Sequence, residues 1–330
     1  MLKTVLLAAG GVLMLLAGAA IYTQWQAARI AARFPPQSVF VTVEGVTIHF
    51  SDLKPEGEPA ANIVLIHGAS GNEREMRAAL GDRLLRKGYR VISVDRPGLG
   101  WSTRKGGADE NDPAAQARLI RKAIEKHGVK QSIAVVHSLA GALGLQLALD
   151  HADVVKGVML IAPATHPWPG GIALYYRIAA SPAGPLFNYT FALPAGQAAM
   201  PAALESVFAP QEPPPDYRAR TGVELVLRPA SFAANAQDVA GLYDFVSREW
   251  PRYRNIRIPV AIVSGDADKI VYTSIHSRNS AREIPGATLN VLPGVGHCPH
   301  WTHPEAVLQA IDEVVARTRD RRDHDNITAR

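Results

Sequence analysis

The sequence predicts an α/β fold, a mostly parallel, doubly wound sheet with an inserted helical cap. Short runs of apolar, often β-branched residues alternate along the chain with amphipathic stretches of helical spacing, and this alternation predicts parallel strands joined by helices. The runs are apolar at nearly every position, which is typical of strands buried on both faces of a sheet. One long segment, residues 163–257, interrupts the alternation and is rich in proline and aromatic residues.

Residues 1–36 are predicted to form a membrane-targeting segment and a linker. Residues 4–22 contain no charged side chain, and a helix of that length spans the ~30 Å hydrocarbon core of a bilayer. An uncleaved single span, with the folded domain on the non-cytoplasmic side, is favoured because the helical pattern continues through residues 24–33. The alternative is a signal peptide cut after the small residues 17–19, which would give a secreted or periplasmic protein.

The core is predicted to consist of residues 37–162 and 258–317. Its first two strands form a hairpin around Glu44-Gly45, a typical turn sequence. The expected strands are residues 39–43, 46–50, 62–66, 90–94, 132–136, 157–161, 259–264 and 288–292. The expected helices are residues 73–87, 113–127, 139–150, 273–283 and 304–317.

Two further segments complete the predicted organisation. Residues 163–257 show no clean strand-helix repeat and are expected to form the mainly helical cap. Residues 318–330 alternate arginine with aspartate and are expected to be a charged, flexible tail. The net charge is only +5 and the basic residues are spread along the chain, so a nucleic-acid partner is not expected.

Polar residues follow several of the apolar strands, at the edge where doubly wound sheets bind their ligands. Ser138 lies in the run VVHSLAG between a strand and a helix, a turn that exposes a hydroxyl beside the N–H groups of the helix N-terminus. The run HGASG at residues 67–71 follows an earlier strand. Its glycines allow close approach of the backbone, so the N–H groups of Ala69 and Leu139 are candidates for an oxyanion hole.

The loops after the last two strands, GDAD at residues 265–268 and GVGH at residues 294–297, are also polar. Together with the loop DRPGLG at residues 95–100, these motifs make the chain resemble the serine hydrolases of the α/β-hydrolase fold over roughly residues 40 to 317. The motifs stand in the family order of nucleophile, acid and histidine.

The resemblance implies a role for each residue of a catalytic triad. Ser138 would attack an acyl carbon, His297 would take its proton and later deliver it to the leaving group, and Asp268 would orient the imidazole. The family pattern G-x-x-D selects Asp268, whereas spacing alone leaves Asp266 as an alternative acid.

The nucleophile turn departs from the family pattern G-x-S-x-G. Val136 and Ala140 stand where the two glycines are usual, and the β-branched Val136 is expected to crowd the turn. A non-catalytic ligand-binding protein on the same fold therefore remains an alternative to a hydrolase.

A hydrophobic small molecule is the expected substrate, with a carboxylic ester as the favoured bond. His137 beside the nucleophile and the cap residues Trp168 and Tyr175 are candidates for the pocket wall, because binding pockets are mostly apolar with a few fixed polar groups. A thioesterase, a carbon-carbon bond hydrolase and a perhydrolase share the acyl chemistry and remain alternatives.

The sequence predicts neither a cofactor nor a metal. A cysteine and three histidines lie close together in the sequence, namely His297, Cys298, His300 and His303. Their spacing fits neither a C-x-x-C nor an H-E-x-x-H zinc motif. Cys298 is the only cysteine, which excludes an internal disulfide framework. The sequence does not indicate an oligomeric state.

Overall fold

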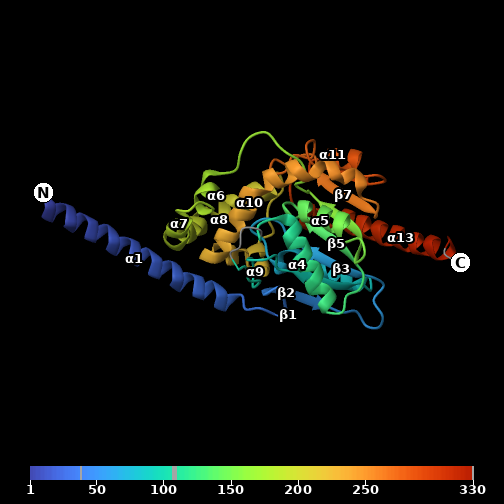
Figure 1. Ribbon diagram of the computed structural model, residues 1–330, viewed down its shortest axis with the longest axis horizontal. Coiled ribbons are helices and arrows are strands. Elements are labelled where there is room, and N and C mark those ends of the chain that lie inside the picture. The colour runs from blue at the N-terminus through green and yellow to red at the C-terminus, as the bar shows by residue number, and fades with distance from the viewer. Residues whose placement is uncertain (38, 106–109, 329–330) are drawn as a thin grey trace.

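The computed structural model describes residues 1–37, 39–105 and 110–328, with side chains up to residue 321. An eight-stranded sheet lies at its centre, flanked by helices (Figure 1). The strands are β1 (Val39–Val43), β2 (Val46–Leu53), β3 (Asn62–Ile66), β4 (Arg90–Val94), β5 (Ser132–His137), β6 (Val155–Ile161), β7 (Val260–Gly265) and β8 (Thr288–Leu292). The predicted α/β fold class is confirmed.

The strand order is β1-β2-β4-β3-β5-β6-β7-β8. The β1–β2 and β2–β4 pairs are antiparallel, and the other pairs are parallel. Because β3, β5, β6, β7 and β8 all run in one direction, the loops that follow them meet at the same edge of the sheet. β5 lies between β3 and β6, so the loop after β5 emerges in the middle of this edge.

The sheet separates two apolar cores. On one face, Val136 of β5 packs with residues such as Ile120 of α4 (Pro113–Lys126) and Leu143 of α5 (Ala140–Asp150). On the other face, Val135 packs with residues such as Ile311 of α13 (Pro304–Thr328). Neighbouring residues of a strand point to opposite faces, which is why these strands are apolar at consecutive positions.

The predicted helix at residues 73–87 is divided in the structure. It consists of α2 (Glu73–Met76), a π-helical turn at Arg77–Gly81 and α3 (Asp82–Arg86). The predicted helix at residues 273–283 is shorter, since α11 comprises Ser277–Glu283.

The polypeptide between β6 and β7 is helical and lies at one side of the sheet (Figure 1). It contains α6 (Leu174–Ala179), α7 (Gly184–Thr190), α8 (Ala192–Phe208), α9 (Tyr217–Thr221), the 3₁₀ helix η2 (Val223–Leu227), α10 (Pro229–Glu249) and the 3₁₀ helix η3 (Trp250–Asn255). We call this segment the cap.

A buried ion pair ties the cap to the core. The two carboxylate oxygens of Asp238 on α10 lie 2.6 Å from Arg96 Nη1 and 2.6 Å from Arg104 Nη2. The side chains of Arg96 and Asp238 are almost fully buried, so each charge depends on the other to offset its loss of hydration.

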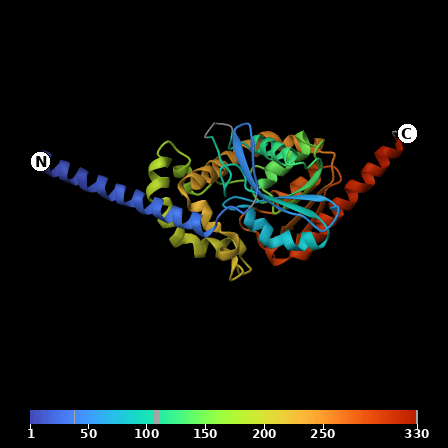
Figure 2. The ribbon, with the colours of Figure 1, turned by 90° about the horizontal axis from the view of Figure 1, so that it is seen from below.

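The first helix, α1 (Leu2–Arg33), is long and only partly packed. Its N-terminal part projects away from the body (Figures 1 and 2). Thr23, Ala27 and Ile30 are buried, and their spacing places them on one helical face. Thr23 Oγ1 donates a hydrogen bond of 3.3 Å to the carbonyl of Thr190 at the end of α7. By length and composition, α1 is a candidate membrane span near the N-terminus, a test that signal sequences also pass.

The last helix extends into the segment that the sequence predicts to be a flexible tail. α13 continues to Thr328, whereas residues 329 and 330 lie outside the described residues. Thr318 is buried, and Arg319 Nη2 donates a hydrogen bond of 2.8 Å to the carbonyl of Ala60. These contacts hold the start of this segment against the core, which a charge pattern alone does not reveal.

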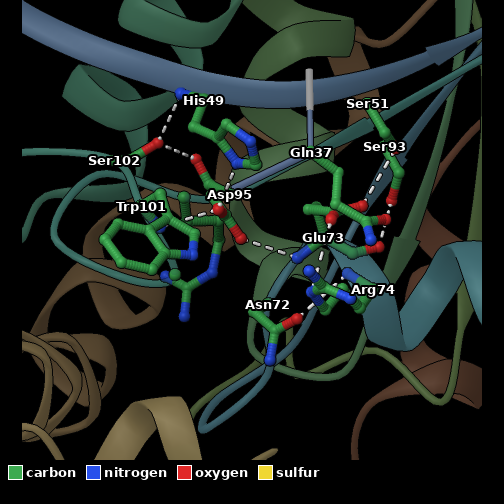
Figure 3. Close-up of polar contacts among 12 residues, drawn as sticks. Gln37, His49, Ser51, Asn72, Glu73, Arg74, Ser93, Asp95, Trp101 and Ser102 are labelled. Carbon is green, nitrogen blue, oxygen red and sulfur yellow. Dashed lines mark hydrogen bonds and ion pairs between the residues drawn. The ribbon is translucent and has the colours of Figure 1, made fainter. Parts of the chain in front are cut away.

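The loop after β4 is fixed by a buried polar network around Asp95 (Figure 3). Asp95 Oδ2 lies 2.7 Å from His49 Nδ1 and accepts a 2.8 Å hydrogen bond from the N–H of Trp101. Its Oδ1 accepts a 2.7 Å hydrogen bond from the N–H of Glu73. The network therefore connects β2, the start of α2 and the loop at residues 95–100.

Candidate active site

The nucleophile candidate Ser138 occupies a sharp turn between β5 and α5. Its φ is +54°, a left-handed conformation that costs free energy in a residue with a Cβ. Ser138 donates its N–H to Ile161 at 2.9 Å, and its carbonyl accepts from Gly141 at 2.8 Å and from Ala164 at 2.9 Å. These backbone hydrogen bonds hold the strained turn in place.

The space that Val136 needs is provided by α5. A Cβ atom added at Gly144 would lie 2.7 Å from Val136 Cγ2. Gly68 is similarly close to the turn, since its added Cβ would lie 2.9 Å from the Cβ of Ser138. Glycines on neighbouring segments therefore accommodate the turn, although the turn itself lacks its usual glycines.

The structure brings His297 and Asp268 to Ser138 from the loops after β8 and β7. His297 Nε2 lies 2.9 Å from Ser138 Oγ, and His297 Nδ1 lies 2.7 Å from Asp268 Oδ2. All three residues are buried. Such a series of hydrogen bonds can transfer a proton from a serine hydroxyl to an imidazole whose cation a carboxylate stabilises.

The geometry distinguishes the two aspartates that spacing left open. Asp268 is buried, and its Oδ1 accepts hydrogen bonds from the N–H groups of Ile270 and Val271 at 2.8 and 2.9 Å. Asp266 is exposed and accepts a 2.6 Å hydrogen bond from the N–H of Gly294. Asp268 therefore contacts His297, whereas Asp266 supports the loop that carries His297.

The loop at residues 67–72 is held from two sides. Arg96 Nε donates to the carbonyl of His67 at 3.1 Å, and Arg96 Nη2 donates to that of Gly68 at 3.2 Å. From the cap, Asn235 Oδ1 accepts a 2.7 Å hydrogen bond from the N–H of Ser70. Asn235 is buried on α10, and sequence reasoning missed it because one asparagine in a helix carries no distinctive signal.

The candidates for the oxyanion hole are the backbone N–H groups of Ala69 and Leu139. Within residues 1–37, 39–105 and 110–328, neither group donates a hydrogen bond. Leu139 belongs to an apolar cluster in which Leu242 and Phe245 of α10 also lie, and Ala69 packs against the cluster. The cap thus forms an apolar wall beside these N–H groups.

The three predicted pocket residues lie in different surroundings. Trp168 packs against the apolar cluster that contains Leu139. His137 is buried, and its Nε2 lies 3.1 Å from the carbonyl oxygen of His297. Tyr175 is 45% exposed on α6, and its ring contacts are with Tyr176 and Phe232. The structure therefore brings Trp168 and His137, but not Tyr175, to the surroundings of Ser138.

A buried carboxylate, Glu75, lies behind the histidines and was missed by the sequence reasoning. Its Oε1 lies 2.7 Å from His300 Nε2 and accepts a 2.7 Å hydrogen bond from Trp301 Nε1. Burial alone would raise the pKa of Glu75, but the nearby His300 and His67 and the hydrogen bonds with His300 and Trp301 together lower it. The ring centres of His137 and His300 lie 4.4 Å apart, and burial lowers the pKa of His137 well below its usual value.

Among the residues that the structure describes, Glu75, His137 and His300 form a group that could offer ligands to a metal ion. Each offers a ligand atom within 4.8 Å of the others. Glu75 and His300 are already bonded to each other, and a metal ion would have to break that contact. The arrangement fits a packed support for the histidine loop better than it fits a metal centre.

A cleft of about 710 Å³ lies elsewhere, between α1, the loop after β4 and the start of α10. Its walls include Ala27, Trp101 and Arg228. Neither Ser138, His297 nor Asp268 lines this cleft. The candidate active site at Ser138, His297 and Asp268 is therefore separate from this cleft.

Comparisons with known proteins agree with the fold and with the general class of activity. The chain is 30% identical over 269 residues to a 2-(acetamidomethylene)succinate hydrolase of Mesorhizobium japonicum, an alignment covering 77% of this chain and 87% of the relative. A membrane phospholipase A of known structure superposes with a TM-score of 0.66 at 22% identity, covering 96% of this chain and 98% of that chain. A Rhodococcus esterase superposes with a TM-score of 0.62 at 22% identity, covering 84% and 97%.

Residues 61–304 match the family model of the α/β-hydrolase fold. The matched region begins just before β3 and ends at the start of α13, so it contains the loops that carry Ser138, Asp268 and His297. The chain therefore belongs to the α/β-hydrolase fold family and is a hydrolase.

Proposed function

We propose that this hydrolase cleaves a carboxylic ester of a hydrophobic small molecule through an acyl-enzyme intermediate. The observation that carries the proposal is the hydrogen-bonded series Ser138, His297 and Asp268, with the serine on a strained turn between strand and helix. A serine that merely caps a helix needs neither the buried imidazole nor the carboxylate behind it.

In the acylation step, Ser138 Oγ attacks the carbonyl carbon while its proton passes to His297 Nε2, 2.9 Å away. The imidazolium that results is stabilised by Asp268, which remains ionised. The negative charge on the former carbonyl oxygen is received by the N–H groups of Ala69 and Leu139. His297 then delivers the proton to the departing alcohol, and the carbon-oxygen bond of the ester breaks.

In the deacylation step, His297 takes a proton from water, whose oxygen attacks the acyl carbon. Collapse of this second tetrahedral intermediate breaks the bond to Ser138 Oγ, and His297 returns the proton to that oxygen. The carboxylic acid leaves and the enzyme is restored, so no cofactor is consumed.

The preference for a hydrophobic substrate rests on the wall that the cap builds beside the oxyanion hole. Leu139, Leu242, Phe245 and Trp168 meet at the nucleophile turn. An apolar wall favours an apolar acyl or alcohol group by removing its surface from water.

We further propose that residues 4–22 of α1 anchor the protein in a membrane, with the hydrolase domain on the non-cytoplasmic side. The helix continues without interruption from these residues into the part that packs on the cap. The structural likeness to the membrane phospholipase A covers 96% of this chain, so it extends into α1. Alkaline washing of membranes distinguishes the anchored protein from one released by signal cleavage.

The experiment that tests the proposed reaction compares wild type with Ser138→Ala and with Ser247→Ala, a matched change of a partly exposed serine on α10. We expect wild type and Ser247→Ala to hydrolyse nitrophenyl esters and to react with a fluorophosphonate probe. Ser138→Ala should lose about 10⁴-fold or more in kcat and should not be labelled. A wild-type protein that neither reacts with the probe nor hydrolyses any ester would contradict the proposal.

A further inference from the structure

The outer face of the cap next to α1 is apolar and exposed. Six large side chains on α6, on α7 and at the boundary with α8 have between 36% and 66% of their surface exposed. They are Leu174, Tyr175, Ile178, Leu186, Tyr189 and Phe191. We call them the cap face. Arg177 is the only charged residue between positions 167 and 204, so this surface lacks the charges that normally cover a soluble protein.

The cap face lies beside the part of α1 where the uncharged, apolar residues end. Residues 4–22 extend about 28 Å as a helix, close to the thickness of a hydrocarbon core. The next residue, Thr23, is fully buried and donates its hydroxyl to the carbonyl of Thr190, at the end of α7. A bilayer crossed by residues 4–22 would therefore have its surface at the level of α7.

Other residues at this level are of the types found at membrane surfaces. Tyr22 and Trp25 are exposed on α1, and the Arg29 guanidinium lies 4.8 Å from the centre of the Trp25 ring. Tyrosine and tryptophan favour the interface between hydrocarbon and water, and arginine favours its polar side. Figures 1 and 2 both place α6 and α7 at the end of the body nearest the free end of α1.

We infer that the cap face rests in the surface of the same lipid bilayer that α1 crosses. The inference rests on the proposed anchor. A lipid surface suits this face better than a protein partner does, because protein interfaces have a polar, charged rim and this stretch of the cap has one charge. An apolar face of this kind enters the boundary between headgroups and acyl chains by about 5–10 Å.

The cap face is also connected to the helix that forms the wall of the active site. The centre of the Phe232 ring on α10 lies 6.4 Å from the ring centre of Tyr175 in the cap face and 6.4 Å from that of the neighbouring Phe187 on α7. The same helix carries Leu242 and Phe245 beside Leu139. Contact of the cap face with lipid would therefore bring the wall of the active site close to apolar molecules dissolved in the bilayer.

The test uses the full chain with a single fluorescent label. Cys298 is buried, and burial raises the pKa of its thiol well above the usual value, so an introduced surface cysteine reacts selectively. Leu186→Cys places the label on the cap face. Lys130→Cys places the label on an exposed residue of the loop before β5. This loop lies at the edge of the sheet opposite the one that carries the loop with Ser138. Each labelled protein is reconstituted into vesicles of phosphatidylcholine and phosphatidylglycerol with or without spin-labelled lipid.

We expect the spin-labelled lipid to quench the label at position 186 at least about twofold and to leave the label at position 130 unchanged. Flotation of the same samples on a density gradient reports anchoring separately. Protein that floats without quenching at position 186 overturns the inference and leaves the anchor intact. Protein that does not float overturns both the inference about the cap face and the proposed membrane anchor.

A second copy of the chain is the competing occupant of the cap face. In that case the label at position 186 would be shielded from iodide in the water but would not be quenched by spin-labelled lipid. Paired labels at position 186 would also quench each other as the protein density in the vesicle rises. Either result overturns the assignment of the cap face to the lipid surface.

Discussion

Gly144 on α5 leaves the space that the side chain of Val136 on β5 fills, since a Cβ at position 144 would lie 2.7 Å from Val136 Cγ2. The two residues therefore act as a pair. A valine two positions before the nucleophile is accommodated because the helix behind it carries a glycine. This relationship explains how the turn at Ser138 closes without its usual glycine.

Replacing Gly144 by alanine should disturb the nucleophile turn. We expect Gly144→Ala to lower the free energy of unfolding by about 1–3 kcal/mol through overpacking and to reduce kcat, because α5 begins next to Ser138. Chemical denaturation and ester hydrolysis measure the two effects.

The double variant Val136→Ala/Gly144→Ala is the control for this pair, because it removes the methyl groups that clash. Its stability and kcat should exceed those expected from adding the two single effects. Strict additivity would show that the two side chains do not interact. Val136→Gly alone should lose stability without a gain in kcat.

The two aspartates of the loop after β7 should differ sharply in their effect on catalysis. Asp268→Asn leaves an amide opposite His297 Nδ1, where it favours the wrong tautomer, and we expect a loss of about 10⁴-fold in kcat. Asp266→Asn, which keeps an acceptor for the N–H of Gly294, should change kcat little. Steady-state kinetics on a soluble ester measure both, and equal losses would contradict the assignment of the acid.

Asp238 should be important for stability although it is remote from the chemistry. Asp238→Asn leaves Arg96, whose side chain is 0% exposed, with a buried charge and no carboxylate. We expect a loss of about 3–5 kcal/mol in the free energy of unfolding. The matched control is Asp216→Asn, which removes an exposed ion pair with Arg220 and should cost less than about 1 kcal/mol. Equal costs would show that burial of the pair is unimportant.

The protein should lose stability on mild acidification. Burial, helped by the charge of Arg96, lowers the pKa of His67 to about 4, and burial together with the neighbouring His166 lowers the pKa of His276 to about 4. Unfolded histidine has a pKa of about 6.5, so between these values the unfolded chain binds more protons than the folded one. The stabilisation that the folded protein gains by keeping these two histidines neutral is complete above pH 6.5 and is lost as the pH falls towards 4.

The variant His276→Asn tests this pH dependence, since its side-chain oxygen can still accept from the N–H groups of Thr165 and His166. Removing one such histidine should reduce the slope of the free energy of unfolding against pH by up to about 1.4 kcal/mol per pH unit between about pH 4 and 6.5. His303→Asn changes an exposed histidine and should leave the slope unchanged. Urea unfolding of the detergent-solubilised protein across this range measures both.

The sequence by itself was sufficient to predict the fold class and most of the strands. β1, β3, β4 and β8 begin and end where the sequence predicts them. In β3 and β4, four consecutive residues are buried, and burial on both faces favours an uninterrupted apolar run. The edge strand β1 instead alternates between half-buried and exposed residues. The motif residues Ser138, Asp268 and His297 were also selected from local patterns and from the family resemblance, since each lies in the loop that follows a predicted strand.

The tertiary structure decided what depends on contacts between distant segments. Spacing alone left Asp266 and Asp268 open and the family resemblance favoured Asp268, but the contact with His297 is visible only in the tertiary structure. The crowding expected at Val136 could not be evaluated without Gly144, because the space around a side chain is set by the helix that packs on it. Asn235 and Glu75 have no local signature, since their roles come from partners 165 and 225 residues away. Local patterning thus determined the elements and the candidate chemistry, and long-range packing determined which of these residues meet.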